Sequence, residues 1–203
     1  TWVNWGGTRK MVMFVGGGYD AGGVDGDARD SNGVKGIYSG FESDTYNQSN
    51  SRGAGVYMFD AINGNLLWWA SKNATQSSAT TTSGVIGLRD DNLKYSVVSE
   101  IRTIDRDADG LADHLYFGDL GGQVFRIDIN NQASTIGSFA KTPRRLLNLN
   151  AAEKSPRFYD PPAFSVYNYN GTKFAVISIG SGNRSQPLKD YTVGSLGYDY
   201  DAI

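Results

Sequence analysis

The residues of this chain that could do chemistry are concentrated in one nine-residue segment, Asp105–Asp113. Carboxylates stand at its first, third, fifth and ninth positions, as Asp105, Asp107, Asp109 and Asp113. Alternating spacing turns the first three carboxylates toward one centre, and hard oxygen ligands of this kind suit Ca²⁺. The segment therefore predicts a Ca²⁺ site.

The rest of the segment completes the expected ligand set. Gly110, at position six, permits the sharp turn of such a loop, and the backbone carbonyl of Leu111 at position seven can point inward. We expect Asp113 to close the site directly or through water. Position twelve is Tyr116, where an EF-hand has a bidentate glutamate, and the flanks resemble strands, so the expected site is a β-bound variant with six or seven ligands.

Electrostatic repulsion favours a bound cation over a solvated acidic turn, which is the alternative. Each pair of carboxylates about 4 Å apart repels by roughly 1 to 4 kcal/mol, depending on the local dielectric. Mg²⁺ is less suitable because it demands near-ideal octahedral geometry and retains several waters. A second acidic stretch, 25–30, lacks the alternating spacing and contains an arginine, so a solvated loop is expected there and a second cation site stays open.

Other chemical signals are weak, and we expect no enzymatic activity. The chain has no cysteine and a single histidine, His114, which we expect to be a half-exposed strand residue rather than a catalytic or zinc-binding one. The spacing Gly16-x-Gly18-x-x-Ala21 resembles a dinucleotide-binding fingerprint, but no helix pattern follows it to receive a phosphate.

The elements that must position the acidic segment are short strands. The chain has 203 residues, of which 26 are glycine, and Asn63-Gly64 and Asn170-Gly171 separate apolar runs in the way typical of hairpins. No pattern predicts a helix longer than about two turns. We expect strands at Lys10–Val15, Gly55–Asp60, Leu66–Ala70, Tyr95–Ile104, His114–Gly118, Gln123–Ile129, Arg145–Leu149, Ala163–Tyr169 and Thr172–Ile179.

A weak internal repeat favours a β-propeller. Glycine, valine, an aromatic residue and a final aspartate recur in Gly55–Asp60 and Gly122–Asp128. A four-stranded blade takes about 40 to 50 residues, so the chain supplies three to four blades. The predicted fold is all-β, a modified and partial β-propeller that spans residues 1–203 as one domain, with polar insertions at about 20–54 and 71–83. A sandwich or an irregular β-domain is the alternative.

The charge and hydrophobicity of the chain argue against a nucleic-acid partner and against a membrane-spanning segment. The formal net charge of −2 is spread along the chain, and the small basic group of Lys141, Arg144 and Arg145 does not make a nucleic-acid surface. No run of 18 apolar residues occurs, so no transmembrane segment is expected in this chain.

The central stretch Asp105–Asp128 resembles the signature of the PilY-type, or PilC-type, type IV pilus tip proteins. In that family a calcium loop runs into a strand pair containing Gly-Asp-Leu-Gly-Gly, which here is 118–122. The segments Phe14–Asp20 and Gly55–Trp68 are similar to the family's blades, and Ile179–Arg184 to its Gly-Ser-Gly-Asn-Arg turn.

The resemblance implies a modified propeller with quinoprotein-like blades but no redox role, and one functional Ca²⁺. It implies roles in pilus extension against retraction, twitching motility and surface adhesion in a Gram-negative bacterium. The implied partners are pilin subunits and minor pilins, with a host or surface receptor possible. The implied location is extracellular, at the bacterial cell surface and pilus tip, in association with the outer membrane. The family's propeller is usually longer, and its adhesive N-terminal region is absent here, so no particular receptor is carried over.

Two other functions remain open from the sequence. The chain could be a quinone-dependent dehydrogenase-like propeller enzyme, for which Trp2, Trp5, Trp68 and Trp69 could line a cofactor platform, although core and blade-edge packing suits them better. It could also be a structural repeat in which calcium only stabilises the fold.

Overall fold

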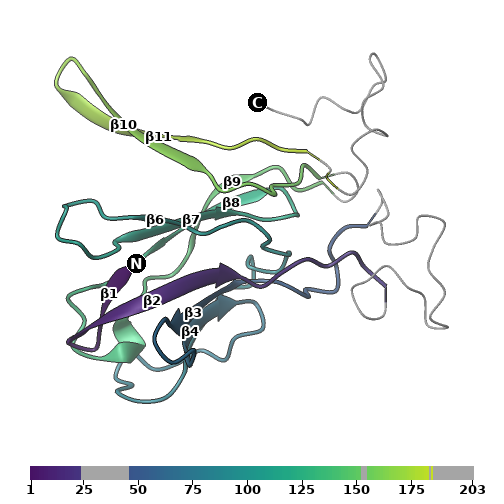
Figure 1. The fold of residues 1–203 in the computed structure, drawn as a ribbon. Coiled ribbons are helices and arrows are strands. Elements are labelled where there is room, and N and C mark those ends of the chain that lie inside the picture. Colours follow the sequence, from purple (N-terminus) through teal and green to yellow (C-terminus); the bar gives the residue numbers. More distant parts are fainter. Residues whose placement is uncertain (24–45, 152–154, 183, 185–203) are drawn as a thin grey trace, which may run out of the picture.

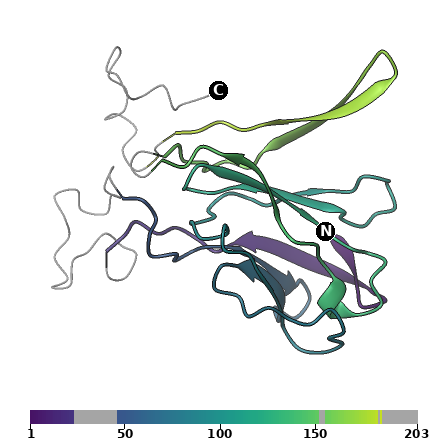
Figure 2. The ribbon, with the colours of Figure 1, turned by 180° about the vertical axis from the view of Figure 1, so that it is seen from behind.

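The computed structural model describes residues 1–23, 46–151, 155–182 and 184, and this part of the chain is all-β. Three sheets lie one above another, with the hairpin β10–β11 projecting beyond the two larger sheets (Figures 1 and 2). The described residues contain one short 3₁₀ turn, η1 at Ile136–Ser138, and no α-helix. No helix in this part is long and apolar enough to cross a membrane. The acidic stretch 25–30 lies outside the described residues.

The first sheet has five strands in chain order. All neighbours pair antiparallel except β4 and β5, which are parallel. The strands are β1 Trp2–Trp5, β2 Thr8–Gly16, β3 Val56–Asp60, β4 Leu66–Ser71 and β5 Ile86–Arg89. The strands expected within β2, β3 and β4 are confirmed, whereas β1 and β5 are additions that the sequence patterns did not indicate.

The second sheet is an antiparallel meander in the order β6-β7-β8-β9. Its strands are β6 Arg102–Ile104, β7 His114–Gly118, β8 Gln123–Asp128 and β9 Arg144–Asn148. Strand β7 is buried along its whole length, because side chains of the molecule cover both of its faces. The predicted acidic segment is the connection between β6 and β7.

The expected strand Tyr95–Ile104 is wrong over most of its length, since only its last three residues form β6. Tyr95, Val97 and Ile101 in the earlier part are apolar and buried, but the backbone groups of this part bond to loops rather than to a neighbouring strand. The Val97 N–H donates to the Gly53 carbonyl at 3.0 Å, and the Gly18 N–H donates to the Val97 carbonyl at 3.1 Å. The apolar pattern of this segment therefore reflects its burial, and its backbone groups find their hydrogen-bond partners in loops instead of in a strand ladder.

The third sheet is the predicted hairpin of β10 Ala163–Tyr169 and β11 Thr172–Ser178. Its turn uses Asn170 and Gly171, at φ of 49° and 82°, as the Asn-Gly signal predicts. One face of the hairpin carries four large exposed side chains, Tyr167, Tyr169, Phe174 and Val176, and Val166 is exposed on the other face.

The hydrophobic core lies between the first two sheets. Trp68 of β4 and Phe117 of β7 are both fully buried in it. Phe139, which lies in the connection between β8 and β9 of the second sheet, packs edge-to-face against Trp5 and Trp68 of the first sheet, at ring-centroid distances of 4.9 Å and 5.9 Å. Burial of these large rings is the main stabilising term that fixes one sheet against the other.

Candidate metal centre

The loop Asp105–Asp113 is fixed at its base by contacts to both large sheets. The Asp113 N–H donates to the Ile104 carbonyl at 2.8 Å, which closes the loop at the ends of β6 and β7. The buried Ala112 donates its N–H to the Trp2 carbonyl of β1 at 2.9 Å. The loop therefore forms a bridge between the sheets.

Hydrogen bonds inside the loop shape its turn. Asp105 accepts the Ala108 N–H at 2.7 Å and the Gly110 N–H at 2.8 Å, one on each carboxylate oxygen. Asp109 accepts the Leu111 N–H at 2.8 Å. Ala108 and Gly110 adopt φ of 64° and 83°, a left-handed conformation that glycine reaches at no steric cost and that strains alanine. The expected sharp turn at Gly110 is thus present.

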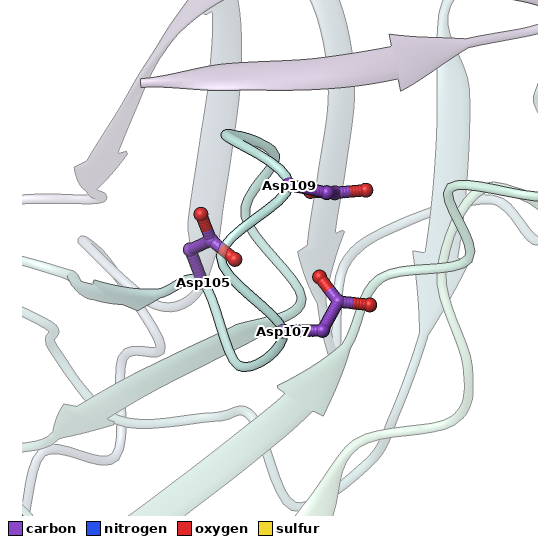
Figure 3. A group of neighbouring side chains, drawn as sticks. All are labelled: Asp105, Asp107 and Asp109. Atoms are coloured by element: carbon purple, nitrogen blue, oxygen red, sulfur yellow. The ribbon is translucent and has the colours of Figure 1, made fainter.

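The loop brings the first three predicted ligands together. One carboxylate oxygen from each of Asp105, Asp107 and Asp109 lies within 4.8 Å of the other two, and all three residues are exposed (Figure 3). Two oxygens bound to the same Ca²⁺ at 2.3 to 2.6 Å can be at most about 5 Å apart. The three oxygens are therefore spaced to share one ion. Each oxygen that already accepts an N–H keeps a second lone pair for that ion.

The other two predicted ligands, Leu111 and Asp113, are not part of this group of three carboxylates. Asp113 lies outside the group of three, and its carboxylate accepts the Arg106 N–H at 2.8 Å. The Leu111 N–H donates to Asp109, which orients the Gly110–Leu111 peptide, whereas the Leu111 carbonyl belongs to the next peptide. Metal ligation by Leu111 and Asp113 stays a prediction.

An arginine of the first sheet lies against the loop. Arg9 of β2 donates to the Gly110 carbonyl at 3.4 Å, while its guanidinium lies 5.2 Å from the centre of the Trp2 ring. A Cβ at Gly110 would approach the Arg9 guanidinium at 3.0 Å. The glycine thus serves both the turn and the contact with β2.

His114 is buried, which corrects the expectation of a half-exposed residue. Its Nδ1 lies 2.8 Å from Asp128, the residue directly opposite on β8. Asp128 also accepts two hydrogen bonds from Arg126, at 2.5 Å and 2.9 Å. The Arg126 guanidinium is the main reason that the pKa of Asp128 lies below its usual range. The histidine is therefore part of a hydrogen-bond network with Asp128 and Arg126 at the end of the strands.

A second carboxyl group was missed by sequence reasoning. Asp119 lies in the turn between β7 and β8 and accepts the N–H groups of Gly121 and Gln123 and the Gln123 side-chain amide, each at 2.9 Å. Burial raises the pKa of Asp119 to about 7, against the opposing effect of these donors. The available signal was an aspartate two residues before Gly-Gly, a pattern typical of a side chain that bonds the backbone N–H two residues on and so caps its own turn.

Comparison with known proteins adds no further information about this site. No protein-family profile, curated protein or solved structure matches the chain.

Proposed function

We propose that this chain is a calcium-binding module of a type IV pilus tip protein. The observation that carries the metal part is the convergence of the Asp105, Asp107 and Asp109 carboxylates on one centre, within a loop whose backbone is already shaped for it. The pilus part is supported by the resemblance of Asp105–Asp128 to the signature stretch of PilY-type proteins. The proposed role is to bias pilus extension against retraction, and with it twitching motility and surface adhesion.

The proposed fold is a modified, partial β-propeller. The four-stranded antiparallel meander β6–β9 has the strand order of a propeller blade. The hairpin β10–β11 exposes apolar side chains on both faces, which is what strands of a further blade present to the blades on either side. Phe164 of β10 already packs against Tyr116 of β7, with ring centroids 5.4 Å apart.

Calcium would act here through conformation. When bound, the ion neutralises the repelling carboxylates and stiffens the connection between β6 and β7. Because Ala112 is hydrogen-bonded to β1, the same stiffening would reach the first sheet. Pilin subunits and minor pilins at the cell surface are the proposed partners whose engagement changes.

The test is a calorimetric titration of the purified chain with Ca²⁺ and, separately, with Mg²⁺. We expect a single Ca²⁺ site that is lost in Asp109→Asn and retained in Asp91→Asn, a matched control that removes an exposed carboxylate paired with Arg89. Absence of Ca²⁺ binding by the unaltered chain would refute the metal site. In bacteria, the same Asp109→Asn change should alter piliation or twitching.

A purely structural role for calcium is the second candidate, and one observation favours it. The loop base is hydrogen-bonded to β1 through Ala112, so an ion there would stabilise the packing of the two sheets. This role predicts that Asp109→Asn lowers the melting temperature in calcium while pilus display and twitching stay normal. Wild-type-like stability with defective twitching would instead support the regulatory role.

A further inference from the structure

A cavity of about 550 Å³ lies beside the metal loop, where β7, β8 and the segment that leads into β9 meet. Four cationic side chains line it, and they come from four places in the chain: Arg106 from the loop, Arg126 from β8, Lys141 from the connection after η1, and Arg144 from the start of β9. The volume lies in the range of small-molecule sites.

Only two carboxylates line the same cavity, and both are already engaged. Asp128 is held by two hydrogen bonds from Arg126 and by the His114 ring. Asp113 accepts the backbone N–H of Arg106. This hydrogen bond uses the Arg106 main chain, so Asp113 does not neutralise the Arg106 guanidinium. One of the four cations is therefore neutralised within the cavity.

The other three cations have no counter-ion among the residues that the structure describes. Across the ranges that the structure describes, Arg106, Lys141 and Arg144 form no ion pair. In addition, Arg144 stands directly opposite Arg126 in the register of β8 and β9. Directly opposite residues point to the same face of the sheet, so the Arg144 side chain lies beside the Arg126–Asp128 pair, and an anion there would balance the unpaired charge of Arg144.

We propose that this cavity is a binding site for small oxyanions, the carboxylate or phosphate groups of a ligand. Arginine presents a planar fork that matches both groups in a bidentate manner, and lysine adds a mobile point charge. Thr142 and Asn130 in the lining add uncharged polar groups that can hydrogen-bond the rest of a polar ligand. This binding activity goes beyond the proposed calcium-dependent role and requires no metal.

The experiment titrates the purified chain with succinate and, in a separate arm, with inorganic phosphate, at low ionic strength, after a chelating resin has removed calcium from the protein and the buffers. Low salt is needed because exposed charges are screened. We expect saturable binding of at least one probe, with the tighter probe identifying the preferred oxyanion. The double variant Lys141→Gln/Arg144→Gln should weaken that binding by roughly tenfold or more, since each charged hydrogen bond contributes substantially.

A matched control separates the cavity from general charge. The double variant Lys72→Gln/Lys173→Gln also removes two positive charges, but from residues outside the cavity lining, and it should leave the affinity for the probe unchanged. Lys141 and Arg144 are exposed, so their replacement should leave the melting temperature unchanged. The proposal is overturned if neither probe binds, or if the control variant loses as much affinity as the cavity variant. Because calcium is removed before the titration, failure of the calcium site does not alter either outcome.

Discussion

The carboxyl group of Asp119 is 1% exposed and sits among three N–H donors in the turn between β7 and β8. Desolvation disfavours its charged form more than the donors favour it, and burial raises its pKa to about 7. Asp128 shows the opposite effect, because the Arg126 guanidinium lowers its pKa. The pKa values of these two aspartates, which are nine positions apart, are thus shifted in opposite directions from the ordinary value.

The raised pKa of Asp119 predicts a fall in stability as pH rises from 5 to 8. The folded state keeps a proton there that the unfolded chain releases near pH 4, so the stabilising contribution is complete below pH 4 and is lost as pH passes about 7. The slope from one group is at most about 1.4 kcal/mol per pH unit. Thermal denaturation at several pH values should show this fall, and Asp119→Asn should flatten it.

The lowered pKa of Asp128 does not contribute to the change in stability between pH 5 and 8. Its stabilising contribution is present above its unfolded pKa, near 4, and is lost only as pH falls below that value. Asp91→Asn, which replaces an exposed carboxylate, should keep the wild-type slope between pH 5 and 8. A slope that is equally steep in Asp119→Asn would contradict the assignment.

At the scale of elements, the glycines next to the strands allow chains to approach closely rather than to bind phosphate. A Cβ on Gly16 would lie 2.2 Å from the Val97 carbonyl oxygen, and one on Gly17 would lie 2.4 Å from the Gly53 carbonyl oxygen. Close backbone contacts therefore explain the glycines of the Gly16–Gly18 segment, whose spacing resembles a dinucleotide-binding fingerprint. The same kind of approach recurs in the turn between β7 and β8.

Gly121 in that turn supplies a direct test. A Cβ there would lie 2.1 Å from the Tyr95 ring, whose hydroxyl donates to the Asn150 side chain at 2.9 Å. Gly121→Ala should push the ring and the turn apart and destabilise the fold by about 1–3 kcal/mol, the usual cost of overpacking. Chemical denaturation measures the change. Gly180→Ala, which meets nothing within 4 Å, should be near neutral, and equal effects of the two would refute the packing argument.

At the scale of the whole molecule, the metal loop depends on the first sheet as well as the second. Asn131 connects them: its side chain accepts the Asn4 N–H of β1 at 3.0 Å and donates to the Ala112 carbonyl at the loop base at 2.9 Å. Its backbone carbonyl also accepts the Asn4 side chain at 2.7 Å. The geometry of the loop is therefore set by contacts 127 positions apart in sequence.

Removal of this link should weaken both stability and calcium binding. Asn131→Ala leaves the Asn4 N–H and the Ala112 carbonyl without their partner in a buried region, at a cost of about 1–3 kcal/mol in the free energy of unfolding. We expect Ca²⁺ affinity, measured by calorimetry, to fall with it because the loop base loosens. Asn168→Ala on the exposed hairpin is the control and should change neither quantity. Unchanged affinity in Asn131→Ala would show that the loop is shaped locally.

The sequence predicted most strands but not those whose identity depends on distant partners. β7, β8 and the hairpin β10–β11 carry continuous apolar runs or an Asn-Gly turn, both of which are local signals. β1 is four residues long, and β5 exists through its parallel pairing with β4, which no local pattern reveals. The buried segment before β6 had the apolar pattern of a strand but bonds to loops.

The sequence by itself determined the acidic loop. The alternation of Asp105, Asp107 and Asp109 and the glycine after them act over a few residues, where covalent geometry restricts what the chain can do. The tertiary structure decided which groups are buried and which distant residues meet: the burial of His114 and Asp119, and the gathering of Arg106 with Arg144 around one cavity. Desolvation and charge proximity depend on these long-range contacts, and spacing along the chain does not encode them.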